Sequence, residues 1–519
     1  MPGLPFPALS RGRGLTHTGA PAPFDTWYDP MTVTLSNAAL AHLPDRVSAP
    51  GYDRSSLTAG ILHFGLGNFH RAHQAMYLDT LMGKGLAQDW ALVGAGVFEG
   101  ERRGRDILAA QDFLTTLVEQ EADTSEARVL GSMIDYIEPA NATATIARMA
   151  EDDIRIVSLT ITEGGYFLDA SDDFDPSHPS IQHDAANPDS PKTVFGMILA
   201  GLRARQAKGL PPFTIMCCDN IPHNGDVTRR TLTGLARLTD PAFADWIVAN
   251  VAFPNGMVDR ITPATTDRER AILRDEFGLE DGWPVFCEDF TQWVLEDNFP
   301  LGRPPLEEAG VQFVDDVIPF ELMKLRILNA GHAVIAYPAG LLNIHFVHEA
   351  MEHPLIRAFL RKIEETEIIP MVPPVPETDT SAYFDKIEER FSNPKIGDTI
   401  RRLCLDGSNR QPKFIVPVIR DALAQGASVE GLALESALWC RYCAGSSDSG
   451  AVIEPNDPNW DALQALALQA KEDPAIWLTQ KAVYGDLAAH DGFVAAFARW
   501  LVMLWTKGTA ATLETYLAE

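Results

Sequence analysis

The chain has 519 residues, a length that predicts two to four domains. Its composition, with 46% hydrophobic and 22% charged residues, excludes a mostly disordered protein. Its 42 lysines and arginines stand against 71 aspartates and glutamates, so the formal net charge is −29. This acidity argues against nucleic acid and anionic membranes as partners and leaves small molecules as the expected ligands.

Residues 1–30 differ in composition from the rest of the chain. They are rich in proline and glycine and show no apolar periodicity. We therefore expect a loosely ordered extension, with Met31 as an alternative start of the protein.

From residue 57 onward, short β-rich runs alternate with amphipathic stretches. The β-rich runs span residues 61–67, 90–97, 154–162 and 213–218, and the amphipathic stretches span residues 71–82 and 194–208. This alternation is typical of a mostly parallel sheet covered by helices on both faces. We assign residues 31–318 to an α/β domain of the Rossmann-like type.

A pair of glycines, Gly65 and Gly67, follows the first β-rich run and precedes a helical pattern. Glycines at that point let the backbone approach a pyrophosphate at a helix N-terminus. The third glycine of the dinucleotide fingerprint is replaced by His70, so an ordinary turn is the alternative. The position after the first strand favours a dinucleotide, with a predicted contact segment of Phe64, Gly65, Leu66, Gly67, Asn68, Phe69, His70 and Arg71.

An acidic pair follows the second β-rich run. A carboxylate at the end of that strand suits the ribose hydroxyls of NAD and would repel the 2′-phosphate of NADP. We favour Glu99 over Glu101 for this role. Arg102 and Arg103 follow directly and could bind the 2′-phosphate of NADP. We nevertheless predict NAD as the cofactor.

Beyond residue 319 the signals are nearly all helical, so we assign residues 319–519 to a mainly α-helical domain. The expected helices span residues 321–336, 353–365, 414–425, 429–442, 460–469 and 492–505.

The first of these helices carries a polar constellation. At 100° per residue, Glu321, Lys324, Asn329 and His332 fall within one arc of about 140°. A desolvated lysine acts as a general base when its pKa is lowered, and an amide can stabilise an oxyanion. The alternative is a solvated helix face with a satisfied histidine.

Three turn segments, residues 160–166, 218–225 and 252–260, follow apolar runs of the α/β domain. The carboxyl ends of the strands are the edge at which open α/β sheets bind ligands. Neither a metal site nor a serine nucleophile is predicted, because His63, His70 and His73 lack ligand spacing and no Gly-x-Ser-x-Gly motif occurs.

In this order the segments resemble those of the polyol-specific long-chain dehydrogenase/reductase family, over roughly residues 35–510. The matching pieces are residues 65–73, 162–166, 218–225, 253–260 and 324–332. The resemblance implies a metal-independent hydride transfer between NAD and a sugar alcohol.

The resemblance also implies a role for individual residues. Lys324 matches the general base, Asn220 and Asn329 the groups that stabilise the alkoxide, His332 the group that holds the reacting hydroxyl, and Glu321 a proton-exchange group. Further matches are the substrate-binding residues Asp259, Arg402 and Arg410, and the cofactor-binding residues Thr162 and Val258.

The leading substrate pair is D-mannitol and D-fructose, with sorbitol or arabinitol as stereochemical or length variants. A hexuronate of the fructuronate/mannonate type is the main alternative, because Arg402 and Arg410 could bind its carboxylate. Against it, Gly164 and Gly165 lie where the uronate reductases tend to carry lysine. An NAD-dependent epimerase or lyase and an inactive binding protein are hypotheses of other classes.

The six cysteines are too sparse for a disulfide framework, and Cys440 and Cys443 lack the second pair that a zinc site needs. There is no apolar run of transmembrane length and no secretory apolar core near the N-terminus. We expect a cytoplasmic enzyme that is a monomer or a weak homo-oligomer.

Overall fold

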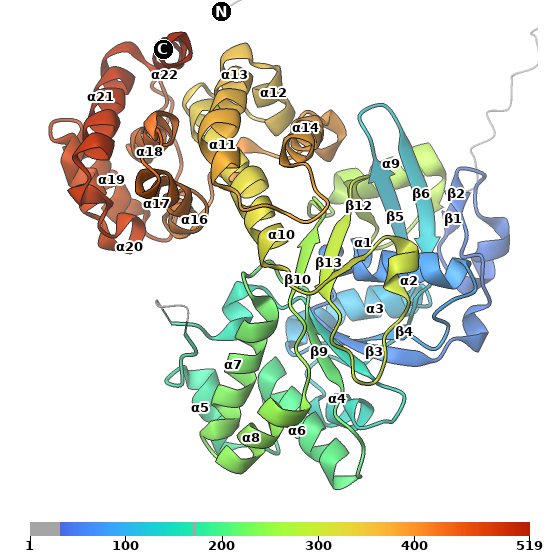
Figure 1. The fold of residues 1–519 in the computed structure, drawn as a ribbon. Coiled ribbons are helices and arrows are strands. Elements are labelled where there is room, and N and C mark those ends of the chain that lie inside the picture. Colours follow the sequence, from blue (N-terminus) through green and yellow to red (C-terminus); the bar gives the residue numbers. More distant parts are fainter. Residues whose placement is uncertain (1–31, 170–172) are drawn as a thin grey trace, which may run out of the picture.

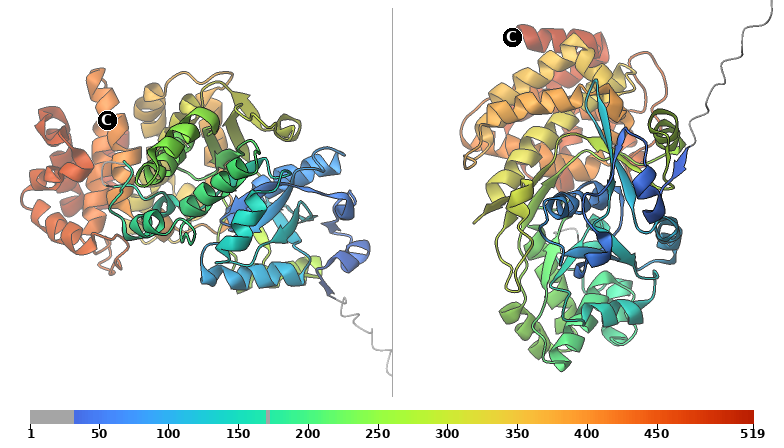
Figure 2. Two further views of the ribbon diagram at one scale, coloured as in Figure 1. Left: turned by 90° about the horizontal axis from the view of Figure 1, so that it is seen from below. Right: turned by 90° about the vertical axis from the view of Figure 1, so that its right-hand side faces the viewer.

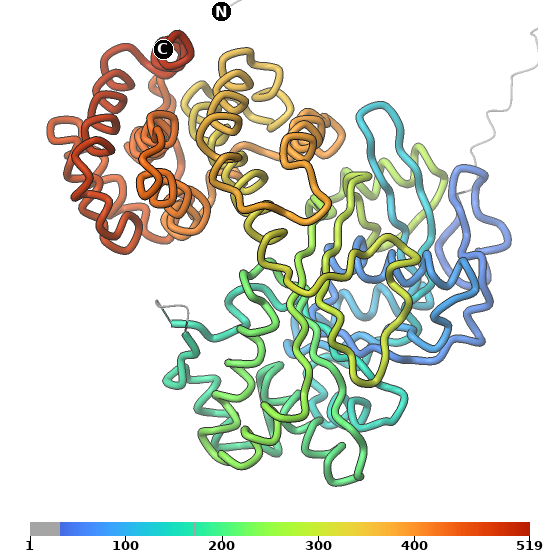
Figure 3. The backbone as a smooth tube through the Cα atoms, viewed as in Figure 1, coloured from blue at the N-terminus to red at the C-terminus, as the bar shows by residue number. Residues whose placement is uncertain are grey.

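The computed structural model describes residues 32–169 and 173–519, so the predicted extension over residues 1–30 and the start at Met31 lie outside the described residues. Figure 1 shows an α/β part and a helical part that meet at α10 (Ile318–Met323). The smoothed chain path makes this junction easy to follow, because the yellow segment leaves the strands and enters the helical part (Figure 3).

A five-stranded parallel sheet forms the centre of the N-terminal part. Its strand order is β7-β4-β3-β8-β9, with β3 (Ala59–Phe64) in the middle. The chain first builds outward on the β4 side and then returns to the β8 side, so the topological switch point lies between β3 and β8. The predicted Rossmann-like sheet is confirmed; its other strands are β4 (Ala91–Ala95), β7 (Met133–Tyr136), β8 (Ile156–Leu159) and β9 (Thr214–Cys217).

Helices cover both faces of this sheet, as two further views show (Figure 2). Ile61 of β3 packs in one core with α2, whereas Leu62 and Phe64 pack in a second core with α6 and α7. Burial on both faces explains why the strands read as continuous apolar runs. The helices of this part are α1 (Asn68–Ala72), α2 (Gln74–Gly83), α3 (Arg102–Ala110), α4 (Ala142–Met149), α5 (Pro179–Ala186), α6 (Val194–Ala207), α7 (Asn224–Arg237), α8 (Pro241–Asn250) and α9 (Asp267–Phe277).

Three smaller sheets were not expected from the sequence. Their strands are short, and most pair with strands far away in the chain, so local periodicity gives little sign of them. Their members are β1 (Val33–Thr34) with β11 (Leu279–Glu280); β2 (Val47–Ser48), β5 (Thr115–Gln120), β6 (Ser125–Leu130) and β12 (Val285–Glu288); and β10 (Gly256–Asp259), β13 (Gln292–Glu296) and β14 (Gln312–Val314).

The C-terminal part is helical, as predicted, and packs around one large apolar core. The six expected helices match observed ones with shifted ends, but α12, α14, α15, α16, α20 and α22 were missed. The helices are α10, α11 (Ala330–Leu341), α12 (Val347–Glu352), α13 (Pro354–Ile363), α14 (Thr380–Phe391), α15 (Ile400–Leu403), α16 (Gly407–Phe414), α17 (Val416–Ala424), α18 (Glu430–Cys443), α19 (Trp460–Ala470), α20 (Lys481–Tyr484), α21 (Asp491–Lys507) and α22 (Thr509–Ala518).

Two helices of this part differ from regular α geometry. Residues Lys324–Asn329 form a π-helical segment that joins α10 to α11, and Glu364–Ile368 form another after α13. A π segment has i→i+5 hydrogen bonds and therefore a wider turn. The regular helix assumed for the polar arc of residues 321–332 was thus wrong in its geometry.

Candidate active site

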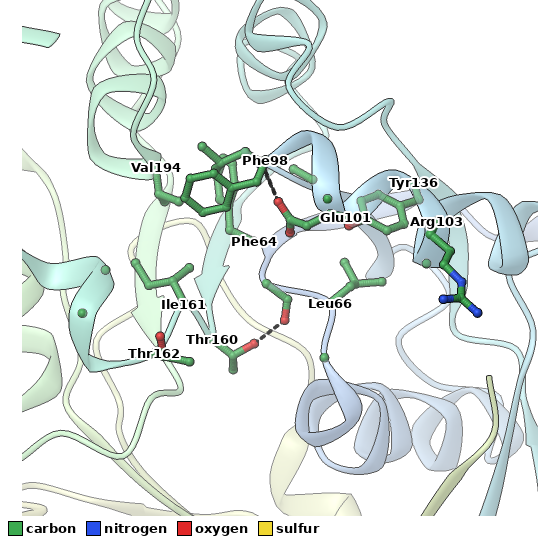
Figure 4. A pocket seen from close by; sticks show the side chains of 18 of the residues that line it. Phe64, Leu66, Phe98, Glu101, Arg103, Tyr136, Thr160, Ile161, Thr162 and Val194 are labelled. Atoms are coloured by element: carbon green, nitrogen blue, oxygen red, sulfur yellow. Dashed lines mark hydrogen bonds between the residues drawn. The ribbon is translucent and has the colours of Figure 1, made fainter. Parts of the chain in front are cut away.

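A cavity of about 1250 Å³ opens at the switch point of the parallel sheet. Figure 4 shows its wall, with Leu66 and Thr160 at the loops that follow β3 and β8, and Phe98 and Glu101 beyond β4. Of the predicted cofactor-binding residues, the wall includes Phe64, Gly65, Leu66, Gly67 and Thr162.

The loop after β3 needs its first glycine for a steric reason. Gly65 has a φ of +93°, and a Cβ atom there would lie 2.0 Å from the carbonyl oxygen of Thr160. At Gly67 a Cβ atom would meet no protein atom closer than 4.0 Å and would instead point into open space beside the cavity. The two glycines therefore leave a cradle of backbone, which is what a dinucleotide pyrophosphate requires.

The other residues of the predicted contact segment lie behind the cavity wall. The Arg71 side chain is 1% exposed, donates to the carbonyl oxygen of Trp283, and lies with its guanidinium 4.0 Å from that indole ring. Asn68 donates to the carbonyl oxygen of Pro263 at 3.0 Å, and His70 stacks on His63 at 3.5 Å between ring centroids. Phe69 stacks on the ring of His73. These side chains hold the glycine loop in place.

The two acidic candidates after β4 lie in different surroundings. Glu101 lines the cavity, and its Oε2 accepts the N–H groups of Val97 and Phe98 at 2.7 Å each. Glu99 is not part of the wall; its carboxylate is 72% exposed and pairs with Arg102 at 2.9 Å. Arg103 is part of the wall, so both signs of charge are present at this end.

The three turns singled out in the sequence are joined by buried polar groups. Asp219, after β9, accepts the N–H groups of Ile161 and Thr162 at 2.8 and 2.9 Å, which ties it to the turn after β8. Asn224 accepts the N–H of Gly256 at 2.9 Å and donates to its carbonyl oxygen at 2.7 Å, which ties the same turn to β10. The turns thus form one edge of the site.

A second cavity, of about 360 Å³, lies between this edge and the helical part. Its wall includes most of the residues predicted to act on the substrate: Asn220, Asp259, Lys324, Asn329, His332, Arg402 and Arg410. Two further residues, Tyr337 of α11 and Phe414 of α16, complete the wall and were not predicted from the sequence.

Lys324 lies at the meeting point of the two parts of the protein. Its side chain is 6% exposed, and Nζ donates to Oδ1 of Asn220 at 2.9 Å and to the carbonyl oxygen of Val258 at 2.5 Å. Burial lowers the pKa of the amine, although Asp259 nearby opposes the shift. The predicted cofactor residue Val258 thus contributes a carbonyl group to Lys324 and lies outside the larger cavity.

His332 lines the second cavity and, among the residues that the structure describes, has one ring nitrogen without a partner. Its Nε2 is buried without a hydrogen-bond partner, and its ring stacks on Phe391 at 4.2 Å. Burial, together with Arg402, holds the pKa of the ring well below its usual value. The imidazole is therefore neutral near pH 7 and can either donate or accept a hydrogen bond.

Glu321 lies on the far side of Lys324, in a small adjoining hollow that both side chains line. Its carboxylate accepts the N–H of His223 at 3.2 Å, and the residue is 6% exposed. Burial raises the pKa of this carboxyl to about 7. Glu321 can therefore exchange a proton near neutral pH.

Asp259 is in the wall of the second cavity, but its charge is already compensated. Arg390 of α14 donates to both carboxylate oxygens of Asp259, at 2.8 and 3.1 Å, and to both oxygens of Glu288, at 2.8 and 2.7 Å. All three side chains are at most 5% exposed. The sequence reasoning missed Arg390, although apolar residues at 383, 387 and 391 carry the helical spacing that would have revealed α14.

The described residues contain neither a candidate metal site nor a membrane-spanning helix. Among residues 32–169 and 173–519, no cluster of three or more histidine, cysteine, aspartate or glutamate side chains could hold a metal ion. In the same ranges, no helix has the length and apolarity that a bilayer-spanning segment requires.

Two family profiles match this chain. Residues 59–308 match the mannitol dehydrogenase Rossmann domain, and residues 316–505 match the mannitol dehydrogenase C-terminal domain. The chain belongs to the mannitol dehydrogenase family. The resemblance stated from the sequence is thereby confirmed.

Individual members of the mannitol dehydrogenase family are similar over nearly the whole chain. A mannitol 2-dehydrogenase of Cereibacter sphaeroides is 58% identical over 474 residues, which are 91% of this chain and 99% of the relative. The solved ternary complex of Pseudomonas fluorescens mannitol 2-dehydrogenase with NAD and D-mannitol is 44% identical, with a TM-score of 0.85, over 94% of this chain and 100% of that one. A D-sorbitol dehydrogenase solved without substrate is 35% identical, with a TM-score of 0.86, over 93% and 100%.

Proposed function

We propose that this protein is an NAD-dependent oxidoreductase that interconverts D-mannitol and D-fructose. The observation that carries the proposal is the buried amine of Lys324, which lies in the wall of a polar cavity next to a glycine-lined dinucleotide cavity. The names of the 58% and 44% identical relatives support the same substrate and cofactor.

In the proposed reaction Lys324 is the general base. Its neutral amine accepts the proton of the substrate hydroxyl, and its lowered pKa increases the neutral fraction. NAD, when bound along Gly65 and Gly67, supplies the hydride acceptor. Glu321, with a pKa of about 7, passes the proton from Lys324 toward solvent.

Asn220, Asn329 and His332 hold the reacting oxygen. Because Oδ1 of Asn220 accepts from Lys324, its amide N–H group faces the substrate and can donate to the developing alkoxide. Asn329 adds a second amide from the π-helical segment, and Nε2 of His332 fixes the hydroxyl before the proton leaves.

In the wall of the same cavity, Arg402 and Arg410 donate to the remaining hydroxyl groups of the sugar alcohol. Asp259 keeps Lys324 and Arg390 in place from the strand side. At the cofactor, Thr162 and the segment from Phe64 to Arg71 form the binding loop, and Glu99 and Glu101 are the acidic candidates at the ribose.

The remaining predictions of the sequence belong to the same proposal. The six cysteines are buried and free, which suits a reducing, cytoplasmic environment. We propose a cytoplasmic enzyme that works as a monomer or weak homo-oligomer, which sedimentation velocity would test.

A substrate panel tests the function. The kcat/KM values of mannitol, sorbitol, arabinitol and mannonate with NAD are measured beside those of fructose and fructuronate with NADH. We expect mannitol and fructose to lead, with sorbitol next because of the 35% identical sorbitol dehydrogenase. Fructuronate exceeding fructose by about tenfold, or about 1.4 kcal/mol of transition-state free energy, would replace the proposal by a hexuronate reductase. Bound NAD without net NADH production would favour an epimerase, a lyase or an inactive binding protein.

A further inference from the structure

Arg402, which lines the second cavity together with Arg260 and Arg410, is paired with Asp398. Its Nε donates to Oδ1 of Asp398 at 2.5 Å, and its Nη2 donates to Oδ2. The Asp398 side chain is 8% exposed, whereas that of Arg402 is 49% exposed and lies in the cavity wall. The pair is therefore a fork-to-carboxylate contact with its acidic partner behind the wall.

Backbone contacts fix this pair in the fold. Oδ1 of Asp398 accepts the N–H of Thr399 at 2.8 Å, and its carbonyl oxygen accepts the N–H of Val347 at 3.0 Å. The Thr399 side chain caps the N-terminus of α15, the helix that carries Arg402. Because α15 packs on α11, the pair keeps a set position relative to His332.

The other charges in the wall are mostly compensated as well. Arg260 pairs with Glu119, and Arg390 binds both Asp259 and Glu288. Arg410 donates to the carbonyl oxygen of Leu403 at 3.0 Å; within the two ranges that the structure describes, no carboxylate comes within 4.0 Å of it.

These pairings compensate the charges of Arg260 and Arg402 in the wall. The Arg390 cluster has one carboxylate in excess, which faces the protonated Lys324 in the reduction direction. A sugar alcohol needs only hydrogen-bond donors from such a wall, and the Nη1 group of Arg402 is not used by Asp398. A substrate carboxylate bound at Arg402 would lie next to the buried carboxylate of Asp398 and would be repelled by it.

We propose that Asp398 determines the substrate class, because it neutralises Arg402 and so makes the cavity select an uncharged polyol over a hexuronate. This inference rests on the proposed function, since it assigns a selectivity to the same site. A hexuronate carries its carboxylate at the chain end remote from the reacting carbon, and Arg402 and Arg410 come from helices α15 and α16, whereas Lys324 comes from the π-helical segment.

The test is the ratio of kcat/KM for D-fructuronate to kcat/KM for D-fructose, measured with NADH. Asp398→Asn keeps an oxygen acceptor for Arg402 but removes the charge, so we expect the ratio to rise at least about tenfold. The gain should arise mainly in the KM of fructuronate.

Two variants serve as controls. Asp398→Glu keeps the charge and should leave the ratio within about twofold of the original protein. Glu307→Gln removes the acid of another pair with i,i+4 spacing, Arg303–Glu307, which lies outside the cavity wall, and should not move the ratio. If Asp398→Asn does not fold, Asp398→Ser removes the same charge and is measured instead.

The outcomes separate this inference from the proposed function. If the unaltered protein already prefers fructuronate, the proposed function fails whatever the variants do. If it prefers fructose and a folded, charge-removing variant keeps the same ratio, the role of Asp398 is refuted and the proposed function stands.

Discussion

Arg390 binds Asp259 with two hydrogen bonds, at 2.8 and 3.1 Å, from a helix of the C-terminal part to a strand of the N-terminal part. The same guanidinium binds both oxygens of Glu288 at the end of β12. Although burial opposes it, Arg390 and Lys324 hold the pKa of Asp259 below its ordinary value. One cation thus joins the helical part to the strands and sets the charge beside Lys324.

Removing this cation should destabilise the protein. In Arg390→Met two buried carboxylates lose their partner, so we expect the free energy of unfolding to fall by about 3–5 kcal/mol. Urea unfolding measures the change. Lys386→Gln, which removes an exposed ion pair on the same helix, should cost less than about 1 kcal/mol. Equal effects of the two substitutions would contradict the role of Arg390.

Lys324→Ala should lower kcat for mannitol oxidation by about 10²–10⁴, the usual effect of losing a general base. In the unaltered protein, oxidation should increase with pH through a pKa below the ordinary lysine value, because only the neutral amine accepts a proton. Fructose reduction should decrease over the same range, since it needs the protonated amine. Stopped-flow rates across pH measure both, and parallel profiles in the two directions would rule out this assignment.

Glu321 should make stability depend on pH. Its folded pKa of about 7 exceeds the usual 4.5, so the folded state binds the proton more tightly. The stabilisation of the folded state that comes from the protonated Glu321 is therefore full below about pH 4.5. It decreases as the pH rises and levels off above about pH 7. Glu321→Gln should remove this slope, seen as a smaller loss of unfolding free energy between pH 5 and about pH 8. An unchanged slope would show that Glu321 is not buried as described.

The cofactor preference should depend on Glu101 more than on Glu99. Glu101→Gln keeps an acceptor for the N–H groups of Val97 and Phe98 but removes the charge, so the ratio of kcat/KM for NAD to that for NADP should fall. Glu99→Ala, which loses an exposed pair with Arg102, should narrow the preference less. A preference of the unaltered protein for NADP would instead favour Arg103 as the residue that recognises the nucleotide.

A chelator should leave the activity unchanged, because a lysine base and amide donors need no Lewis acid. Activity with NAD and mannitol is measured after dialysis against EDTA and again after zinc is added. Loss of activity that zinc restores would overturn the metal-free scheme.

The α/β fold and the helical C-terminal part could be predicted from the sequence, because strands buried on both faces and helical spacing are local patterns. The chain determined these through short-range periodicity and spacing, which do not depend on distant residues. The candidate reaction and the roles of Lys324, Asn329 and His332 came from the resemblance of five segments to a known family.

Other features depend on residues that only the folded chain brings together. The π-helical segment at Lys324–Asn329, the placement of Glu101 in the cavity wall with Glu99 outside it, and the Arg390 bridge all depend on partners far away in the sequence. The charge of the second cavity is decided in the same way. Arg402 is a cation in the sequence, but Asp398 behind the wall compensates it, because electrostatic energy depends on distance and burial in space.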